Sequence, residues 1–188
     1  MKLDNILIII SGPSGSGKST ICDDIIKRNK SILYSISHTT RNRRGDEIDG
    51  VDYNFVSENE FGRMIGDGEF VEWALVHGNY YGTSFKSIES NKNTIVLLII
   101  DVQGAKQLIS KYGADSITSI FIDAPSIDDL ELRLIERDTD SIETINKRLK
   151  NSKIEMESKE LFRFHVINDN LEIAINDVEK IVINTTTL

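Results

Sequence analysis

Apolar runs and amphipathic segments alternate along much of the chain. Continuous aliphatic runs predict buried strands at Asn5–Ile10, Thr94–Ile100 and Ser116–Ile122. Helical spacing of apolar residues follows the first two of these strands, from about Lys18 to Arg28 and from Ala105 to Tyr112. This order of elements predicts an α/β fold in which a central parallel sheet is flanked by helices.

The middle third of the chain breaks this alternation. A short strand is predicted at residues 31–37, and the polar, basic, glycine-containing stretch at residues 38–50 predicts a loop. Short alternating segments follow at Asp52–Val56 and Glu69–Leu75, with a helix, Glu58–Ile65, between them. These segments predict a small mixed sheet inserted into the fold.

The last third is rich in charged helical sequence. Residues 127–161 predict two charged helices separated by the sequence DTDS, and this pair is expected to form a mobile flap. A last strand is predicted at His165–Asn168 and a closing helix at Leu171–Ile183.

Composition narrows the class of protein. The 188 residues suffice for one domain, and 39% hydrophobic with 28% charged residues is an ordinary globular balance. We expect no membrane partner, because no apolar stretch approaches the roughly 20 residues of a membrane span, and we interpret the N-terminus as a strand and not a signal. A net charge of −8 argues against a broad nucleic-acid surface. The single cysteine, Cys22, cannot form an internal disulfide, which favours a reducing cytoplasm.

A glycine-rich loop between the first strand and the first helix carries the most specific motif. It fits the pattern G-x-x-x-x-G-K-[ST], in which backbone N–H groups surround a phosphate, the lysine reaches the β and γ oxygens and the serine can ligate Mg²⁺. Asp101, at the end of the strand Thr94–Ile100, is the candidate acidic partner of that Mg²⁺. The candidate residues of the loop for binding a nucleoside triphosphate are Gly12, Pro13, Ser14, Gly15, Ser16, Gly17, Lys18, Ser19 and Thr20.

The acceptor of the phosphoryl group has to be inferred from the middle third. Arg41 and Arg44, with tyrosines nearby, could hold a second phosphate, although a solvated basic turn explains the arginines equally well. Glu72 lies in the apolar run FVEWALV, where a carboxylate could accept the N1–H and N2–H donors of guanine. An exposed strand residue is the simpler explanation of Glu72 taken alone.

Taken together, these segments and others resemble the guanylate kinases, and the resemblance extends over nearly the whole length of the chain. The blocks that carry the resemblance are SGPSGSGKST, SISHTTR, GVDYNFVS, FVEWALVHGNYYGT, IIDVQGA, LELRLIER, INKRL and VINDNL, in the order of the family. The resemblance implies a P-loop NTPase fold and transfer of the ATP γ-phosphoryl group to GMP, and to dGMP, with Mg²⁺. It also implies a core (1–37, 89–125 and 161–188), a GMP-binding subdomain (38–88) and a helical lid (126–160), in a monomer or homodimer.

The resemblance further implies a role for each matching residue. The GMP site would comprise Ser37, Arg41, Arg44, Tyr53, Glu72, Tyr81, Thr83 and Asp101, with Asn168 near the adenine of ATP. Ser19 and Asp101 would bind the metal ion, and Asp101 would do so through a water molecule. The catalytic residues would be Lys18, Arg41, Arg133, Arg137 and Arg148, and ordinary surface arginines are the alternative for the helical ones.

Three positions depart from the family pattern. The pattern TTR-x-P-R-x-G-E has Arg43 in place of proline and Asp46 in place of the second glycine, so the loop's backbone conformation is open. In the pattern L-D-I-D-x-Q-G, the first aspartate is Ile99. Two alternatives also stay open, a kinase for another nucleoside monophosphate and a binding module that has lost turnover. His38, His77 and His165 are expected to be structural, because an anionic acceptor needs no strong general base.

Overall fold

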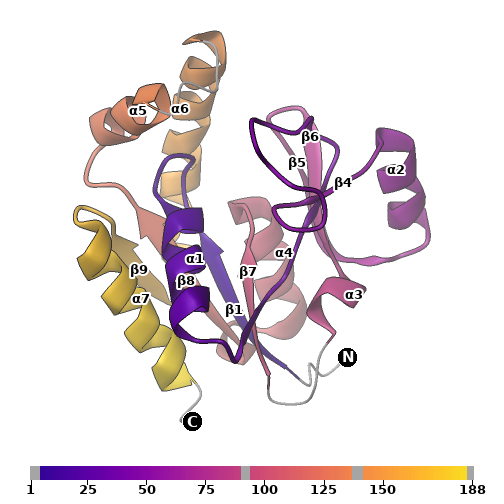
Figure 1. Cartoon of the computed structure of the whole chain (residues 1–188), viewed down its shortest axis with the longest axis horizontal. Coiled ribbons are helices and arrows are strands. Elements are labelled where there is room, and N and C mark those ends of the chain that lie inside the picture. The colour runs from indigo at the N-terminus through magenta and orange to yellow at the C-terminus, as the bar shows by residue number, and fades with distance from the viewer. Residues whose placement is uncertain (1–4, 90–93, 137–141, 186–188) are drawn as a thin grey trace.

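The computed structural model describes residues 5–89, 94–136 and 142–185, and its centre is a five-stranded parallel sheet (Figure 1). The strand order is β2-β7-β1-β8-β9, and every neighbouring pair is parallel. The strands are β1 (Ile6–Ser11), β2 (Ile32–Tyr34), β7 (Ile95–Ile99), β8 (Ile117–Asp123) and β9 (Phe164–Ile167). Because β1 lies between two other strands, its carboxyl end opens near the middle of the sheet, where the glycine-rich loop begins.

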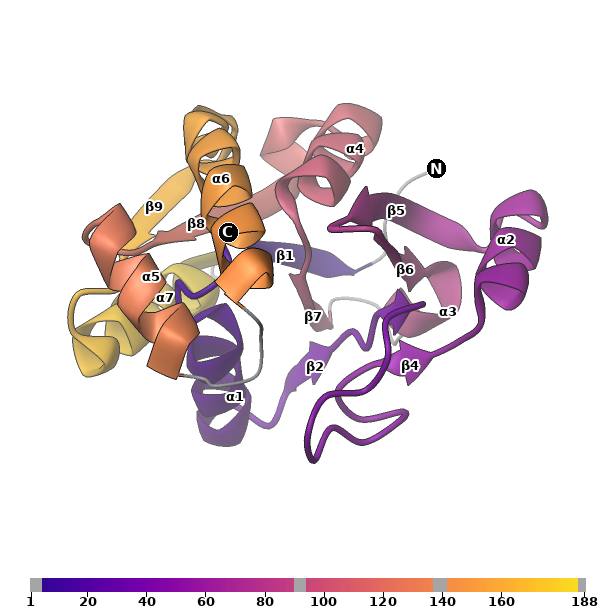
Figure 2. The same cartoon turned by 90° about the horizontal axis from the view of Figure 1, so that it is seen from above.

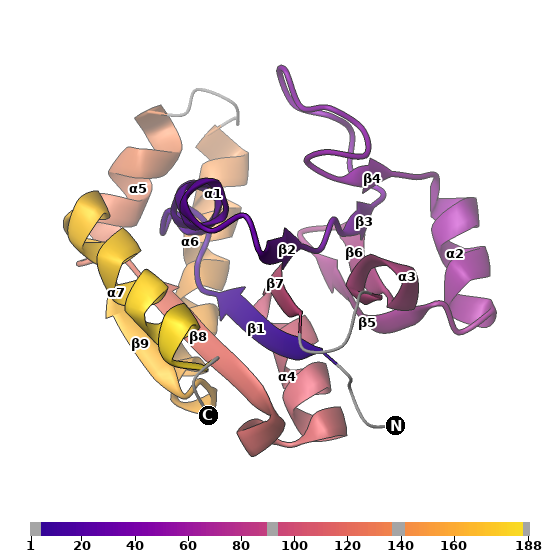
Figure 3. The ribbon, with the colours of Figure 1, turned by 60° about the horizontal axis from the view of Figure 1, so that its bottom comes forward.

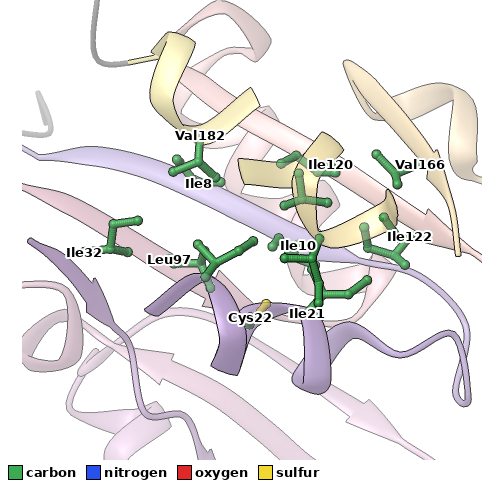
Figure 4. Packing of buried hydrophobic residues seen from close by; sticks show 14 residues of the cluster. Ile8, Ile10, Ile21, Cys22, Ile32, Leu97, Ile120, Ile122, Val166 and Val182 are labelled. Carbon is green, nitrogen blue, oxygen red and sulfur yellow. The ribbon is translucent and has the colours of Figure 1, made fainter. Parts of the chain in front are cut away.

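Helices cover both faces of this sheet, so its strands are apolar on both sides. Helices α1 (Lys18–Arg28) and α7 (Leu171–Thr185) pack together on one face, and α4 (Val102–Tyr112) covers the other (Figure 3). Alternate residues of β1 separate accordingly, with Ile8 and Ile10 facing α1 and α7 and Leu7 and Ile9 facing α4. Figure 4 shows the first cluster, which joins these isoleucines to Ile21, Cys22, Ile32, Leu97, Ile120, Ile122, Val166 and Val182.

The predicted fold class is confirmed, and the predicted central elements lie within a few residues of the observed ones. Helix α1 has the predicted bounds, and β1, β7, β8 and β9 each differ from the prediction by one residue at both ends. Helix α4 begins at Val102, three residues before the prediction. The reason is that the carboxylate of Asp101 accepts a hydrogen bond from the backbone N–H of Gly104 at 2.9 Å and caps the helix.

A second sheet of four strands, in the order β4-β3-β6-β5, lies beside the first (Figure 2). It contains β3 (His38–Thr39), β4 (Asn54–Phe55), β5 (Phe70–Val76) and β6 (Asn79–Ser84), and it mixes parallel and antiparallel pairs. Helix α2 (Glu58–Gly66) packs on it through a small core of Phe61, Met64 and Phe70. The predicted inserted mixed sheet is therefore present.

Three details of this sheet were not predicted. Residues 38–50 begin with a short strand, β3, and strand β6 and the short helix α3 (Phe85–Ile88) were missed. Strands β5 and β6 form a hairpin whose two-residue turn has positive φ at both His77 (53°) and Gly78 (88°). Such turns usually carry Asn-Gly or Asp-Gly, so a histidine at the first position conceals the signal.

Two helices extend above the carboxyl end of the central sheet (Figures 1 and 2). They are α5 (Ile127–Glu136) and α6 (Ile142–Glu157), the two helices that the charged segments predicted, and they pack against each other. Figure 2 places them on one side of the central sheet and the second sheet with α2 on the other. Short 3₁₀ turns occur at Ala114–Ser116 and Lys159–Leu161. Within the described residues, no helix is both long and apolar enough to cross a membrane.

Candidate active site

A cavity of about 670 Å³ lies where the glycine-rich loop, the second sheet and α6 meet. Most of the candidate site residues predicted from the sequence line this cavity, although they come from distant segments of the chain. They are Gly12, Ser14, Gly15, Gly17, Lys18, Ser19, Ser37, Arg41, Arg44, Tyr53, Glu72, Tyr81, Asp101 and Arg148. Pro13, Ser16, Thr20, Thr83, Arg133 and Asn168 are absent from its lining, and Arg137 lies outside the described residues.

The glycine-rich loop depends on glycine at positions where a side chain cannot fit. A Cβ on Gly12 would lie 2.0 Å from the carbonyl oxygen of Ile122, and Gly12 has a φ of +140°. The Lys18 Nζ donates hydrogen bonds to the carbonyl oxygens of Gly12 at 2.7 Å and Pro13 at 2.8 Å. The loop therefore curves around its own lysine and leads into the N-terminus of α1, where backbone N–H groups favour an anion.

Asn168 supports the loop from behind. Its Nδ2 donates to the carbonyl oxygen of Ser16 at 2.8 Å, and a Cβ on Gly17 would lie 2.3 Å from that nitrogen. The carbonyl oxygen of Asn168 accepts a hydrogen bond from Arg133 Nη2 at 2.8 Å. The Nη1 of Arg133 is buried without a hydrogen-bond partner in the described structure. Asn168 thus links the loop to an arginine of α5.

Arg148 joins helix α6 to the glycine-rich loop. Only 7% of its surface is exposed, and its Nη1 donates to the Ser14 Oγ at 3.2 Å. A buried guanidinium at this position brings a fixed positive charge to the phosphate-binding loop.

Arg41 is held by a carboxylate that the sequence reasoning did not nominate. It forms a two-pronged ion pair with Glu47, with N–O distances of 2.6 and 2.8 Å, and its guanidinium lies 5.1 Å from the centre of the Tyr53 ring. Burial alone would raise the pKa of Glu47, but hydrogen bonds from the Arg41 side chain and the Arg44 N–H lower it. The Arg41 Nε is buried without a hydrogen-bond partner among the described residues. Glu47 is the last residue of the same sequence pattern that contains Arg41 and Arg44, and this position was the available signal that it could pair with an arginine.

The loop around Arg44 tolerates both departures from the family pattern. Gly45 takes the positive φ of +46°, and Asp46 does not, so aspartate at that position meets no backbone strain. Arg43, which stands in place of proline, stacks its guanidinium over the Phe55 ring at 5.3 Å and lies 3.6 Å from a carboxylate oxygen of Asp49.

Glu72 lines the same cavity and is buried, with 4% of its surface exposed. Burial raises its pKa to about 7; hydrogen bonds from Thr83 lower it, and the nearby charge of Asp101 raises it. A Cβ on Gly104 would lie 2.2 Å from the Glu72 Oε2, so glycine is needed where helix α4 approaches the carboxylate. Ser37 and Thr83 place their hydroxyl oxygens 3.4 Å apart beside it. The simpler explanation of Glu72 as an exposed residue is wrong.

The raised pKa of Glu72 predicts that GMP affinity increases with pH. Only the ionised carboxylate accepts two N–H donors, and a pKa of about 7 means that the ionised fraction increases about tenfold from pH 6 to pH 8. We expect the GMP dissociation constant, measured by calorimetry, to fall by up to about tenfold over that interval. Glu72→Gln is the control, because the GMP phosphate itself titrates near pH 6. An equal pH dependence in the two proteins would contradict the prediction.

Helix α6 adds a carboxylate that the sequence did not nominate. Glu155 lines the cavity; burial raises its pKa to about 7, which the charge of Lys18 opposes and that of Asp101 reinforces. Glu155 lies two turns after Arg148 on the same face of α6. The spacing between Arg148 and Glu155 was the only signal in the sequence that could have pointed to Glu155. That spacing does not reveal which surface of the protein α6 covers. Ile99 lines the same cavity.

The three histidines fall in different places. His38 packs edge-on against Phe70, and burial lowers its pKa. His165 Nε2 lies 2.8 Å from the carbonyl oxygen of Lys159. His77 lines the cavity and lies within hydrogen-bond distance of Asn151 on α6.

Comparison with known proteins agrees with this geometry. The family model for guanylate kinase matches residues 4–185. The chain belongs to the guanylate kinase family. This family phosphorylates GMP to GDP with ATP, and its members are nucleoside monophosphate kinases.

Individual guanylate kinases cover nearly the whole chain. The guanylate kinase of Carboxydothermus hydrogenoformans is 44% identical over 94% of this chain and 87% of its own length. That of Geobacter sulfurreducens is 42% identical over 97% and 90%. The crystal structure of guanylate kinase from Anaplasma phagocytophilum superposes with a TM-score of 0.82 at 30% identity, covering all of this chain and 89% of the other. The predicted family is therefore confirmed.

Proposed function

We propose that the chain transfers the γ-phosphoryl group of ATP to GMP, or to dGMP, by direct in-line displacement, giving ADP and GDP. The observation that supports this most strongly is that one cavity is lined by the phosphate loop on one side and by a buried carboxylate with two arginines on the other. A donor site and an acceptor site that share one cavity can bring two phosphates together.

ATP would bind at the glycine-rich loop. Backbone N–H groups of residues 13–20 and the N-terminus of α1 would surround the β-phosphate, and Lys18 would leave the carbonyl oxygens of Gly12 and Pro13 for the β and γ oxygens. Asn168, which supports Ser16 and Gly17 from behind, is proposed to lie near the adenine end.

GMP would bind against the second sheet. Arg41, Arg44, Tyr53 and Tyr81 would hold its phosphate, and the unpartnered Nε of Arg41 is a donor directed at no group of the described structure. The base would be read by Glu72 together with Ser37, Thr83 and Asp101. A buried carboxylate accepts the N1–H and N2–H of guanine, whereas adenine offers no such pair of donors on that edge.

Positive charge would stabilise the transferring group. Lys18 and Arg148 lie at the loop, Arg133 offers a buried Nη1, and Arg41 approaches from the GMP side. Arg137 is proposed for the same task from its sequence position alone.

The oxygen ligands present fit a Mg²⁺ ion that keeps most of its water. Ser19 and Asp101 both line the cavity, but the Asp101 carboxylate already accepts hydrogen bonds from the Gly104 N–H and Gln103 Nε2. In the described residues no three His, Cys, Asp or Glu side chains gather as a metal site. We therefore propose Ser19 as a direct ligand and Asp101 as a partner through water, with substrate phosphates completing the shell. When bound, Mg²⁺ neutralises charge on the phosphates.

We propose that residues 38–88 and 126–160 close over a core of residues 1–37, 89–125 and 161–188, because an open site would transfer the phosphoryl group to water. Small-angle scattering should therefore show a smaller radius of gyration with a bisubstrate inhibitor than without it. An unchanged radius would contradict closure. The expected cytoplasmic location, the monomeric or dimeric state and the lack of nucleic-acid and membrane partners stay predictions from sequence.

A product balance tests the proposed reaction. With ATP, Mg²⁺ and GMP, phosphorus NMR should show ADP and GDP forming in equal amounts. ADP and inorganic phosphate without GDP would indicate hydrolysis and contradict the proposal, and binding of GMP without any product would favour a binding module.

A further inference from the structure

A direct contact joins the second sheet to the helices above the central sheet. The Asn151 Nδ2 lies 2.7 Å from the His77 Nδ1, so the amide can donate to the ring nitrogen. His77 is in the turn of the β5–β6 hairpin, and Asn151 is in the middle of α6. In Figure 1 the hairpin, which belongs to the second sheet, and α6 both lie in the upper half of the view. The contact therefore bridges two parts of the molecule that border the same cavity.

Turn chemistry alone does not favour histidine here. Both His77 and Gly78 have positive φ, and two-residue turns of this kind prefer asparagine, aspartate or glycine at the first position. Histidine adopts positive φ more often than most residues other than glycine, but it is not among the residues that this type of turn prefers. Its ring reaches α6, which gives the side chain a role that the turn does not need.

The residues on each side of the contact belong to the two halves of the site. The hairpin strands carry Glu72 and Tyr81, and α6 carries Arg148 one turn before Asn151. Arg148 in turn donates to Ser14 of the glycine-rich loop. A chain of contacts thus runs from the strands that face GMP, through His77 and Asn151, to an arginine at the phosphate loop.

We propose that His77 and Asn151 are positioning residues, whose hydrogen bond ties α6 to the GMP-binding hairpin and so sets Arg148 over the phosphate loop. This inference rests on the proposed function. GMP held by the hairpin favours the position of α6 in which Arg148 meets the transferring group, so ATP reacts with the nucleotide in preference to water. The bond acts on kcat more than on the binding of either substrate.

Three variants separate this role from folding. His77→Gly removes the ring but suits the positive φ, and Asn151→Ala removes the partner within a helix. Each should lower kcat with GMP about three- to tenfold, the loss expected for one hydrogen bond, leave the KM for GMP within about twofold, and raise ATP hydrolysis relative to transfer. His77→Asn keeps a turn-compatible residue with an acceptor oxygen the same number of bonds from the backbone, so it should restore most of kcat. Thermal melts check that all variants fold.

The double variant and the wild type complete the test. His77→Gly combined with Asn151→Ala should lose no more than either alone, because both remove the same bond. Additive losses, an unchanged kcat, or losses confined to the KM for GMP would overturn the inference while the active wild type upholds the proposed function. A wild type that forms no GDP would overturn both.

Discussion

Lys18→Ala is expected to lower kcat with GMP about a hundred- to a thousandfold, the cost of removing one preorganised donor from a developing charge. The structure places Nζ inside the curve of the loop, against the carbonyl oxygens of Gly12 and Pro13. Alanine leaves the β and γ oxygens without that cation, and nothing else in the loop has its reach. Steady-state ADP release measures the loss.

Two checks make this result specific to Lys18. Lys30→Ala removes the same charge from an exposed position beyond α1 and should leave kcat unchanged. Thermal unfolding of Lys18→Ala should remain cooperative, because the loop is also held by Asn168. A loss smaller than about tenfold in kcat would mean that the loop does not hold the transferred phosphate.

Glu72→Gln is expected to lower kcat/KM for GMP about ten- to a hundredfold and to leave the KM for ATP within about twofold, because one charge-assisted pair of hydrogen bonds is lost. Glutamine keeps the size of the side chain, so the cavity beside Gly104 is preserved. It presents one acceptor and one donor to a guanine edge that offers two donors. The loss should therefore appear with GMP and not with ATP.

Inosine monophosphate sharpens the test, since its base lacks the N2 amino group. The wild type should prefer GMP to this analogue strongly. In Glu72→Gln the preference for GMP over the analogue should be much weaker. Glu58→Gln, at the exposed start of α2, is the matched control and should behave as the wild type. Equal losses for GMP and ATP would show that Glu72 supports the fold and does not read the base.

Local sequence predicted the elements that depend on local forces. The run Leu7 to Ile10 is buried between two strands, and the loop that follows β1 ends in a helix with the predicted bounds. Strand β6 was missed because its turn begins with His77 and its own sequence, NYYGTS, is mostly polar. The antiparallel pairing with β5 fixes this strand and its register, and that pairing cannot be inferred from the sequence of β6 alone.

Sequence motifs named many of the residues that line the cavity, and the roles assigned to those residues stay predictions. Arg41 and Glu72 were named from their sequence blocks. Glu47 stands in the same block as Arg41, but only the structure shows the ion pair between them, and Glu155 reaches the cavity only because α6 packs beside the other elements that line it. Burial then alters the chemistry, because the raised pKa of Glu72 depends on desolvation first and on Asp101 as well. These effects depend on tertiary contacts that no spacing rule contains.

The net charge of −8 is compatible with two anionic substrates, because the arginines and Lys18 gather at one cavity. The same lining also contains carboxyl groups, among them those of Asp101 and Glu155. Charge is therefore arranged locally, and the whole-chain sum does not describe the site.

We propose that the buried carboxylate of Glu72 and the phosphate loop serve one reaction with one acceptor base. The most direct measurement is ADP release from ATP and Mg²⁺ with GMP, dGMP, AMP, UMP, dTMP or no acceptor, under identical conditions. We expect turnover with GMP and dGMP and only background release of ADP with the other acceptors. Comparable turnover with AMP, UMP or dTMP, or with no acceptor at all, would contradict it.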